Sequence, residues 1–579
     1  MLRSLVGSEM CIRDRNMTLL ETFVPETNPT GQLWLSALLA SLPIICMLVT
    51  LGALRWKAHY AALASWGVAL IVAIAAFQMP VVMALSTSVH GILYGIFPIV
   101  WILLTAIWMY EVTVKSGRFE DLRRTFFLIS DDPRVVGLII AFSFGGLLEA
   151  LAGYGAPVAI AAAMLIAVGF SPIRAAMVAL LANTVPVAFG AVGLPIVVAA
   201  QTAELDVLAV APISGRITAI LSLVVPFLIL LVMDGAKGLK QCWPVGLVIG
   251  VSFGVTKWIV SSTPLFNLTE MFAAVVSIAV TLGFLKLWHP TGGTDAKGRI
   301  SAMMAPEVEK DWEPATHDDA DQPELTTNRI VMALVPYLMV IVVFGLASIP
   351  AVKNFLKSLD VSFAWPLLGN LMGLDGSPAS HQTYTLLWAS SPGILLAIVA
   401  ILTGVVYKMS LGQTFAVLWE NMKKMRFSAL TIGLVVALAY VMGDSGQTLA
   451  LGFFIAAAGS IYAALAPILG WIGTYVTGSD TSANILFSGL QSTVGQEIGQ
   501  GSHLGVQGMR ELLVGANAAG GVVGKMISPQ SLTIAATAIG LVGSESVVLR
   551  KVFKWSLILL ALMCVIVGLM STPVLSWLI

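Results

Sequence analysis

Three ionisable residues lie inside long apolar stretches of this 579-residue sequence, and each is close to glycine, serine or proline. Glu149 precedes the segment "GYGAP", Asp480 lies within "TGSDTS", and Lys525 lies within "GGVVGKMISP". A charged side chain at membrane depth is costly, so this location indicates a functional role by default. Together, one ammonium group and two carboxyl groups could bind a small anion and a proton.

Each charged residue accompanies a predicted break in a membrane helix. Where a helix stops inside a membrane, its last carbonyl or first N–H groups lack partners, and its N-terminus carries about half a positive charge. Glycines permit tight turns at such a break, and serine or threonine can cap a half-helix or donate to a carboxylate. We therefore expect a site for one small anion. The predicted substrate-binding residues are Gly153, Tyr154, Gly155, Asn183, Tyr475, Thr477, Ser479, Thr481, Ser482, Asn517, Lys525, Ser528 and Gln530.

These residues also have structural explanations. Glycine and proline are common in membrane helices, where a single break can be a packing kink. Glu149 could pair with a helix end, and Lys525 could extend to the membrane surface. Asn183 and Asn517 could hold broken backbone together instead of contacting a ligand. The presence of matched breaks in two parts of the chain favours a binding site.

A buried site that takes up and releases a proton requires a group that is neutral in one state and charged in another. Burial in a low dielectric disfavours the charged form of a carboxyl group, whereas a neighbouring lysine favours it. We predict that Asp480 carries the proton, with Glu149 as the second candidate. The histidines lie in predicted loops, at span ends or beside a basic residue, so none is predicted as a proton relay. Glu111, Lys257 and Asp444 are expected at the membrane interface.

The composition defines the environment of these residues. Hydrophobic residues make up 58% of the chain and charged residues only 11%, with a mean hydropathy of +0.92, which excludes an ordinary soluble protein. The formal net charge of zero gives no signal for nucleic-acid binding, and the four scattered cysteines have no metal-binding or redox spacing. We find no motif for a cofactor, a metal ion or a catalytic triad, so the sequence argues against an enzyme.

A spanning helix needs about 20 mostly apolar residues. We therefore predict an all-α polytopic membrane protein with about twelve transmembrane helices and two hairpins that enter the membrane and return. The hairpins are expected at 135–170 and 450–491, where small and polar residues interrupt apolar stretches. The segment 361–374 is too short to place. The predicted spans are residues 32–53, 61–85, 91–113, 175–200, 211–232, 243–262, 266–288, 329–349, 391–407, 428–443, 510–540 and 553–578.

Each predicted hairpin is followed by a broken helix with matching spacing. "ANTVPVAFGAVGLP" in 175–200 and "ANAAGGVVGKMISP" in 510–540 share Ala-Asn, a glycine seven residues after the asparagine, and a proline five residues further on. Short-loop Lys and Arg residues, which favour the cytoplasm, predict that the first hairpin enters from the cytoplasm and the second from outside. The halves would then be inverted copies, which is typical of transporters.

The predicted organisation has four parts. Residues 1–16 are unlike the rest and are expected to be a non-native extension, with Met17 as the natural start. The first inverted half covers 17–288, and the charge-rich stretch 289–328 is a cytoplasmic loop. The rest of the second half covers 329–579, and that half is expected to begin already with the span 266–288.

Four segments resemble the L-lactate permease family, which includes glycolate permeases: "EALAGYGAPVAI", "LLANTVPVAFGAVGLP", "TYVTGSDTSANILF" and "GANAAGGVVGKMISPQSLTIAATA". The start "TNPTGQLWLSALLASLPI" is also similar, so the resemblance extends from about Met17 to Ile579. It implies proton-coupled uptake of L-lactate, D-lactate and glycolate across a bacterial inner membrane. It also implies kinship with ion-transporter-superfamily carriers, whose hairpin-bearing domain moves in an elevator-like step.

Two other kinds of transport protein remain as alternatives. A sodium-coupled carboxylate transporter differs only in the coupling ion. An anion channel could use the hairpins as filter loops, but it would be expected to line a continuous pore rather than duplicate one closed site. The expected partners are the small-molecule substrate, protons and membrane lipid, with no nucleic acid.

Overall fold

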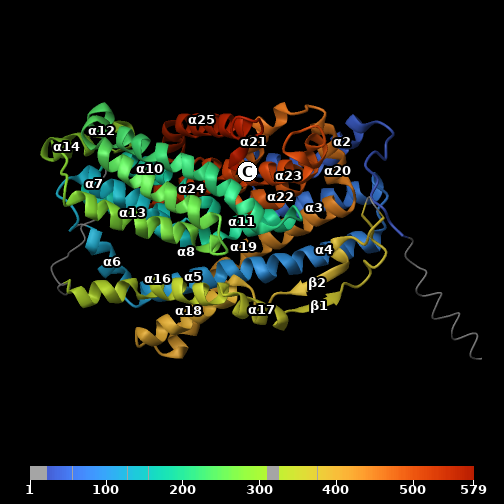
Figure 1. The fold of residues 1–579 in the computed structure, drawn as a ribbon, viewed down its shortest axis with the longest axis horizontal. Helices are drawn as coiled ribbons and strands as arrows, with labels where there is room; N and C mark the ends of the chain where they lie inside the picture. Colours follow the sequence, from blue (N-terminus) through green and yellow to red (C-terminus); the bar gives the residue numbers. More distant parts are fainter. Residues whose placement is uncertain (1–21, 55, 127, 154, 310–324, 374–375) are drawn as a thin grey trace, which may run out of the picture. The chain divides into compact units, whose positions relative to one another are not determined.

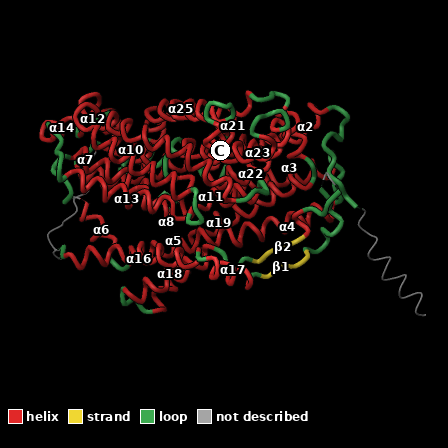
Figure 2. The backbone as a smooth tube through the Cα atoms, in the orientation of Figure 1, coloured by secondary structure: helices red, strands yellow, loops and turns green. Residues whose placement is uncertain are grey.

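The computed structural model describes residues 22–579 except 55, 127, 154, 310–324 and 374–375. In this part of the chain nine helices are long and apolar enough to cross a membrane, or ten if the bent pair Pro172–Ala182 and Val187–Thr202 forms one span. Figure 2 shows helices and loops throughout, with one two-stranded ribbon in the described chain. The predicted fold class, an all-α polytopic membrane protein, is confirmed. The extension predicted at 1–16 lies outside the described residues.

The chain divides into two compact units. Unit 1 comprises residues 22–98, 360–388 and 427–457. Its helices pack closely where α4 (Val81–Tyr94) meets α19 (Leu411–Asp444), since a Cβ atom at Gly91 would lie only 2.7 Å from the Cα atom of Ala437. The helices of unit 1 are α2 (Leu33–Leu48), α3 (Ala58–Ala75), α4 (Val81–Tyr94), the C-terminal part of α19 (Leu411–Asp444) and α20 (Gln447–Ala456).

Unit 1 also holds the two strands of the structure's ribbon. Strands β1 (Val361–Ala364) and β2 (Thr383–Leu386) pair antiparallel, with Val361 opposite Leu386. The segment 361–374, which is too short for a membrane span, therefore begins with a strand. The alternating β-branched and aromatic residues "VSF" and "TYT" favour this extended conformation.

Unit 2 comprises residues 99–359, 389–426 and 458–579, and it contains Glu149, Asp480 and Lys525. The predicted loop 289–328 includes two short helices, α14 and α15. The helices of unit 2 are α5 (Trp101–Lys115), α6 (Arg118–Phe126), α7 (Pro133–Leu138), α8 (Gly145–Ala152), α9 (Ala156–Val168), α10 (Pro172–Ala182), α11 (Gly190–Thr202), α12 (Val207–Ser261), α13 (Thr269–Leu285), α14 (Gly293–Ile300), α15 (Pro306–Glu309), α16 (Thr327–Ser348), α17 (Pro350–Leu359), α18 (Pro392–Val406), the N-terminal part of α19, α21 (Ile461–Thr477), α22 (Asp480–Gly499), α23 (Gly505–Lys525), α24 (Pro529–Ala538) and α25 (Glu545–Met570).

Helix α12 is too long for a single crossing. Its 55 residues, at about 1.5 Å each, far exceed the roughly 30 Å of a bilayer's hydrocarbon core. The chain turns at Gly235, where φ is 63° and ψ is −154°. Beyond it the two halves pack antiparallel, because Cβ atoms at Gly250 and Gly254 would lie 2.7 and 2.9 Å from the carbonyl oxygens of Ser222 and Ala219. This single element therefore supplies two of the predicted spans.

Two helical hairpins in unit 2 carry the predicted tips. In the first, α7, the π-helical stretch Ile139–Phe144 and α8 form one arm, and α9 folds back along it. In the second, α21 and α22 are the arms, and both pack against α23, so that the three helices lie side by side (Figure 1). The second hairpin covers 461–499 rather than 450–491, because α20 packs against α2 in unit 1.

The two predicted broken helices are interrupted at different kinds of residue. Helices α10 and α11 meet at 62°, and Ala191, Val192 and Gly193 at the start of α11 have left-handed φ values of 44°, 60° and 74°. Helix α23 ends at Lys525 and α24 begins at Pro529. Proline suits the first turn of a helix because it has no N–H group to leave unpaired there.

Candidate functional site

Glu149 and Lys525 form an ion pair inside unit 2. Lys525 Nζ donates to Glu149 Oε1 at 2.7 Å and to the carbonyl oxygen of Gly153 at 2.8 Å. Glu149 is 1% exposed and Lys525 8% exposed. Gly153 follows the last residue of α8, where backbone carbonyl groups lack helical partners. The ammonium group therefore pairs with a buried carboxylate and also donates to a carbonyl oxygen that has no partner within its helix.

Asp480, the first residue of α22, brings a second carboxyl group to this pair. It is 3% exposed, and its Oδ1 accepts only a long hydrogen bond, 3.4 Å, from Thr474 Oγ1. Its Oδ2 has no hydrogen-bond partner among the described residues. Lys525 and Glu149 both interact with it electrostatically. One ammonium group is thus paired with one buried carboxyl group and lies within electrostatic range of a second.

Glycines allow these carboxyl groups to approach the backbone. A Cβ atom at Gly190 would lie 2.9 Å from Glu149 Oε1, and a Cβ atom at Gly521 would overlap the carboxylate of Asp480. Gly521 and Lys525 are one turn apart on α23 and share a face of that helix. Asp480 therefore lies about one helical turn from Lys525 along α23.

Both hairpin tips contact the same helix, α24. A Cβ atom at Gly155, in the first tip, would overlap the side chain of Ile534. A Cβ atom at Gly478, in the second tip, would lie 2.5 Å from Gln530 Oε1. Glycine is required at both positions for a further reason, because Gly155 has φ of 94° and Gly478 has φ of 74°. The tips of hairpins far apart in the sequence are thus brought to one place.

Three helices begin at these tips and at the second break. Helix α9 starts after Gly155, while α22 and α24 start after the capping residues Ser479 and Ser528. The hydroxyl oxygen of Ser479 accepts from the N–H of Ser482 at 3.3 Å, and that of Ser528 accepts from the N–H of Ser531 at 3.2 Å. Helix N-termini favour anions, because their free N–H groups and the helix dipole both attract negative charge.

The other predicted residues of the second tip are held locally. Thr477 Oγ1 donates to the carbonyl oxygens of Gly473 and Ser479 at 2.8 and 3.0 Å. The ring of Tyr475 stacks on Trp471, with centroids 6.2 Å apart. Thr481 is half-buried in the first turn of α22. Tyr154, predicted at the first tip, lies outside the described residues.

The two predicted asparagines have different neighbours. Asn183, at the end of α10, is buried and interacts with the carboxylate of Glu149, and its Oδ1 has no partner among the described residues. Asn517 instead joins α23 to α22. Its Nδ2 donates to Asn484 Oδ1 at 2.9 Å, and its Oδ1 accepts from Gln491 Nε2 at 3.3 Å. The structure therefore brings Asn183 to the charged cluster and shows Asn517 engaged in a helix contact.

Two charged residues expected at the membrane interface are buried against other segments of the protein. Lys257 is completely buried and paired with Glu270. Asp444, in unit 1, is 8% exposed and bonds to Thr87 at 3.0 Å and His381 at 2.7 Å. Both residues lie near the ends of apolar runs, where a sequence cannot distinguish an interfacial side chain from one covered by another segment.

Thr474 is a site neighbour that the sequence reasoning missed. It lies four residues before Gly478, just as Glu149 lies four residues before Gly153. Aligning the two hairpins on these tip glycines would have matched Thr474 to Glu149 and directed attention to it. Gly190 belongs to the matched spacing of the broken helices and Gly521 does not, but only the fold places either of them against a carboxylate.

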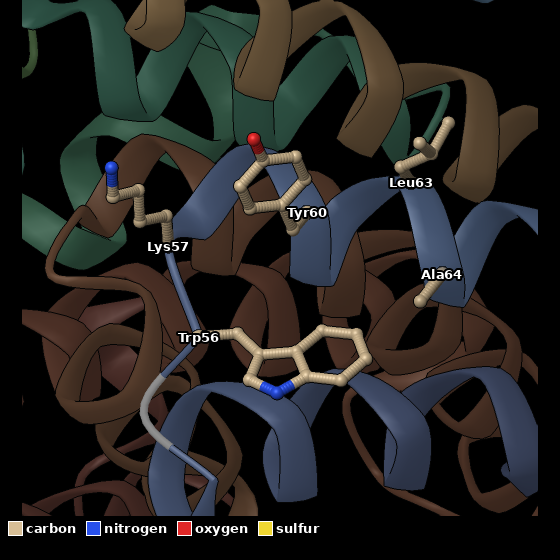
Figure 3. A pocket seen from close by; sticks show the side chains of 5 residues that line it. All are labelled: Trp56, Lys57, Tyr60, Leu63 and Ala64. Carbon is tan, nitrogen blue, oxygen red and sulfur yellow. The ribbon is translucent and has the colours of Figure 1, made fainter.

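A surface pocket of about 550 Å³ lies elsewhere, in unit 1. Figure 3 shows that its side chains come from α3 and the residues just before it. Tryptophan and tyrosine are enriched where membranes meet water, so an exposed aromatic pocket of this kind suits lipid contact. It contains one charged side chain and no carboxyl group, unlike the cluster in unit 2. The pocket is lined by Trp56, Lys57, Tyr60, Leu63 and Ala64.

Comparison with known proteins gives a consistent result over nearly the whole chain. The family model described as L-lactate permease matches residues 36–574. The L-lactate permease of Bacillus subtilis (strain 168) is 37% identical over 568 residues, which cover 95% of this chain and 98% of that protein. The glycolate permease GlcA of Escherichia coli (strain K12) is 38% identical over 542 residues, covering 92% and 94%. Among solved structures, the YdaH transporter of Alcanivorax borkumensis is 15% identical, with a TM-score of 0.43 over 85% of this chain and 88% of that one.

Proposed function

Because this chain belongs to the L-lactate permease family, we propose that it is a secondary active transporter that carries L-lactate, D-lactate or glycolate together with protons. The chain is a multi-pass membrane protein of that family. We assign it to a bacterial inner membrane, since the relatives with these names are bacterial.

The observation that carries this proposal is the cluster of one ammonium group and two buried carboxyl groups beside the hairpin tips. With all three groups ionised, the cluster has a net charge of −1. Binding of a monocarboxylate without a proton would change the net charge of the cluster to −2. Two like charges 4 Å apart repel by about 4 kcal/mol at an effective dielectric constant near 20. If one proton enters with each substrate anion, the empty and loaded sites carry the same charge.

Asp480 is the proposed proton carrier. No lysine or arginine contacts its carboxylate within ion-pair distance in the described chain, whereas Glu149 already has Lys525. A buried carboxyl group without a cation partner favours its protonated form. Glu149 is the second candidate, because release of Lys525 to a substrate carboxylate would leave Glu149 unpaired.

The substrate carboxylate is proposed to bind Lys525 and the donors of the tips. These donors are the N–H groups at the starts of α9, α22 and α24 and the hydroxyl groups of Ser479, Thr481 and Ser482. Both tips and both broken helices lie within unit 2, which supports a single moving domain formed by two inverted repeats. Residues 135–200 and 458–540 would then cross the membrane together with the substrate.

Radiolabelled uptake into proteoliposomes tests the proposed function. An inward proton gradient should drive accumulation of labelled L-lactate above equilibrium, and unlabelled D-lactate and glycolate should compete. A sodium gradient at equal pH should drive none, and accumulation under that condition would identify a sodium-coupled carrier instead. Flux that does not saturate and never exceeds equilibrium would indicate a channel and overturn the proposal.

A further inference from the structure

Lys257 and Glu270 form a second buried ion pair, to which the proposed transport cycle assigns no role. Lys257 Nζ lies 2.5 Å from Glu270 Oε1, and neither side chain is exposed. The same Nζ donates to the carbonyl oxygen of Val185 at 2.7 Å and lies 5.4 Å from the centre of the Phe189 ring. Glu270 Oε2 has no hydrogen-bond partner among the described residues. A buried ion pair is often no more stabilising than apolar residues of similar volume, so stability alone does not account for it.

The contacts of this pair fall on the break between α10 and α11. Val185 lies where the helix has stopped, so its carbonyl group needs a partner from outside the helix. A second bond holds the other end of the break, because Asn267 Nδ2 donates to the carbonyl oxygen of Val192 at 2.8 Å. Val192 has φ of 60°, which is unfavourable for a β-branched residue and persists only where surrounding contacts enforce it. The segment from α12 to α13 thus holds the break at both ends.

The same break forms part of the surroundings of Glu149. Asn183 interacts with the Glu149 carboxylate, and Gly190 leaves space for it that a Cβ atom would fill. Helix α13, which carries Glu270, also packs against α8, which carries Glu149. The two glutamates interact electrostatically through the interior. A displacement of the break would therefore change how Glu149 meets Lys525.

We propose that Lys257 and Glu270 are positioning residues for transport, which fix the break at 183–193 so that Glu149 is held against Lys525. This inference rests on the site proposed above. The ammonium group of Lys257 acts through its bond to Val185, and Glu270 keeps that ammonium group in place without touching the substrate.

The test compares KM and maximal rate of lactate exchange in proteoliposomes. The variants are Lys257→Met with Glu270→Gln, Glu149→Gln, and the triple combination. The double variant removes both charges together, so no unpaired charge is left buried. We expect the double variant to change KM about fivefold or more, in the same direction as Glu149→Gln. The triple variant should have the same KM as Glu149→Gln alone, because the effects of coupled residues are not additive. An unchanged KM, or additive effects in the triple variant, would overturn the inference.

A charge swap separates positioning from simple charge balance. Lys257→Glu with Glu270→Lys keeps opposite charges but moves the ammonium group from α12 to α13, so it can approach the Val185 carbonyl group only from a different helix. We expect this charge-swapped variant to have the melting temperature of the unmodified protein but a different KM. If both the melting temperature and KM match those of the unmodified protein, a positioning role is contradicted. Lys286→Met, at the exposed end of α13, is the matched control. If Glu149→Gln itself leaves KM unchanged, the proposed substrate site fails and the inference fails with it. If Glu149→Gln changes KM and the pair acts additively, only the inference fails.

Discussion

The two lysine–glutamate pairs of unit 2 share their local chemistry and differ in what surrounds them. In each pair the ammonium group donates to Oε1 of the glutamate and to a backbone carbonyl oxygen at a helix break, and Oε2 has no partner among the described residues. Asp480 lies near Lys525 as a second carboxyl group, and the Lys525 side chain keeps 11% exposure. The side chains of Lys257 and Glu270 are fully enclosed.

This difference suggests how one interaction can serve two purposes. A lysine with a second carboxyl group nearby can change partners without passing through an unpaired state, which suits a cycle of binding and release. A sealed lysine with one partner cannot do so at an acceptable cost, since a buried unpaired charge is destabilising by about 3–5 kcal/mol. The first pair therefore fits the moving chemistry of transport, and the second fits a fixed support.

The largest expected effect is the loss of the Glu149–Lys525 pair, which we call the exchanging pair. Lys525→Met alone leaves the Glu149 carboxylate unpaired. The decisive variant is therefore Lys525→Met with Glu149→Gln, which removes one positive and one negative charge together. We expect it to reach the membrane with a melting temperature near that of the unmodified protein, and to lose lactate uptake and exchange completely, because no ammonium group remains for the substrate. Exchange above one tenth of the normal rate would remove Lys525 from the site. The exposed Lys286→Met again serves as control.

The next effect concerns coupling rather than binding. Asp480→Asn should still exchange labelled for unlabelled lactate but lose accumulation driven by a pH gradient, since the asparagine cannot release or take up the proton. Exposed Asp295→Asn should behave normally. If Asp480→Asn keeps proton-driven accumulation while Glu149→Gln loses it, the two carboxyl groups have exchanged roles, and the proposed assignment of Asp480 is refuted.

The residues of the exchanging pair were easier to predict from the sequence than those of the Lys257–Glu270 pair, which we call the sealed pair. The reason is physical. Glu149 and Lys525 lie next to glycines and prolines inside apolar runs, and this combination marks a break at membrane depth. Lys257 lies near the end of the second half of α12, and nothing in its neighbourhood signals that α13 and the break cover it. Burial by distant segments is a property of the fold, which a single sequence does not reveal.

The bounds of the helices were also predicted with unequal success. Helix α25 begins and ends eight residues before its predicted span 553–578, whereas both bounds of α16 were predicted within two residues. The start of the second hairpin was not, since α20 is as apolar as α21 and only its packing on α2 assigns it to unit 1. The tip of that hairpin was located correctly, because Gly478 and Ser479 are strong signals for a turn and a helix cap.

A smaller expected effect would show that the exchanging pair moves. Single cysteines at Ala156 and Thr481, half-buried near the two tips, should change their labelling by a membrane-impermeant thiol reagent about threefold together when lactate is added at low pH. Gly155 is unsuitable for cysteine because of its φ of 94° and its contact with Ile534. A cysteine at Ala64 in α3 should not respond. Independent changes at 156 and 481 would contradict one moving domain and favour a fixed pore.

The smallest expected effect concerns Gly190, which belongs to the break held by the sealed pair and borders the exchanging one. In Gly190→Ala the new Cβ atom would lie 2.9 Å from Glu149 Oε1 and 3.3 Å from its Cγ, so the glutamate side chain must shift by a few tenths of an ångström. We expect KM for lactate to change about two- to threefold, equivalent to roughly 0.4–0.7 kcal/mol, with little change in melting temperature. Gly283→Ala on α13 is the control, since a Cβ atom there meets nothing within 4 Å. A change in KM that persists undiminished in the Glu149→Gln background would show that Gly190 acts independently of Glu149, and the two pairs would then not be connected through this break.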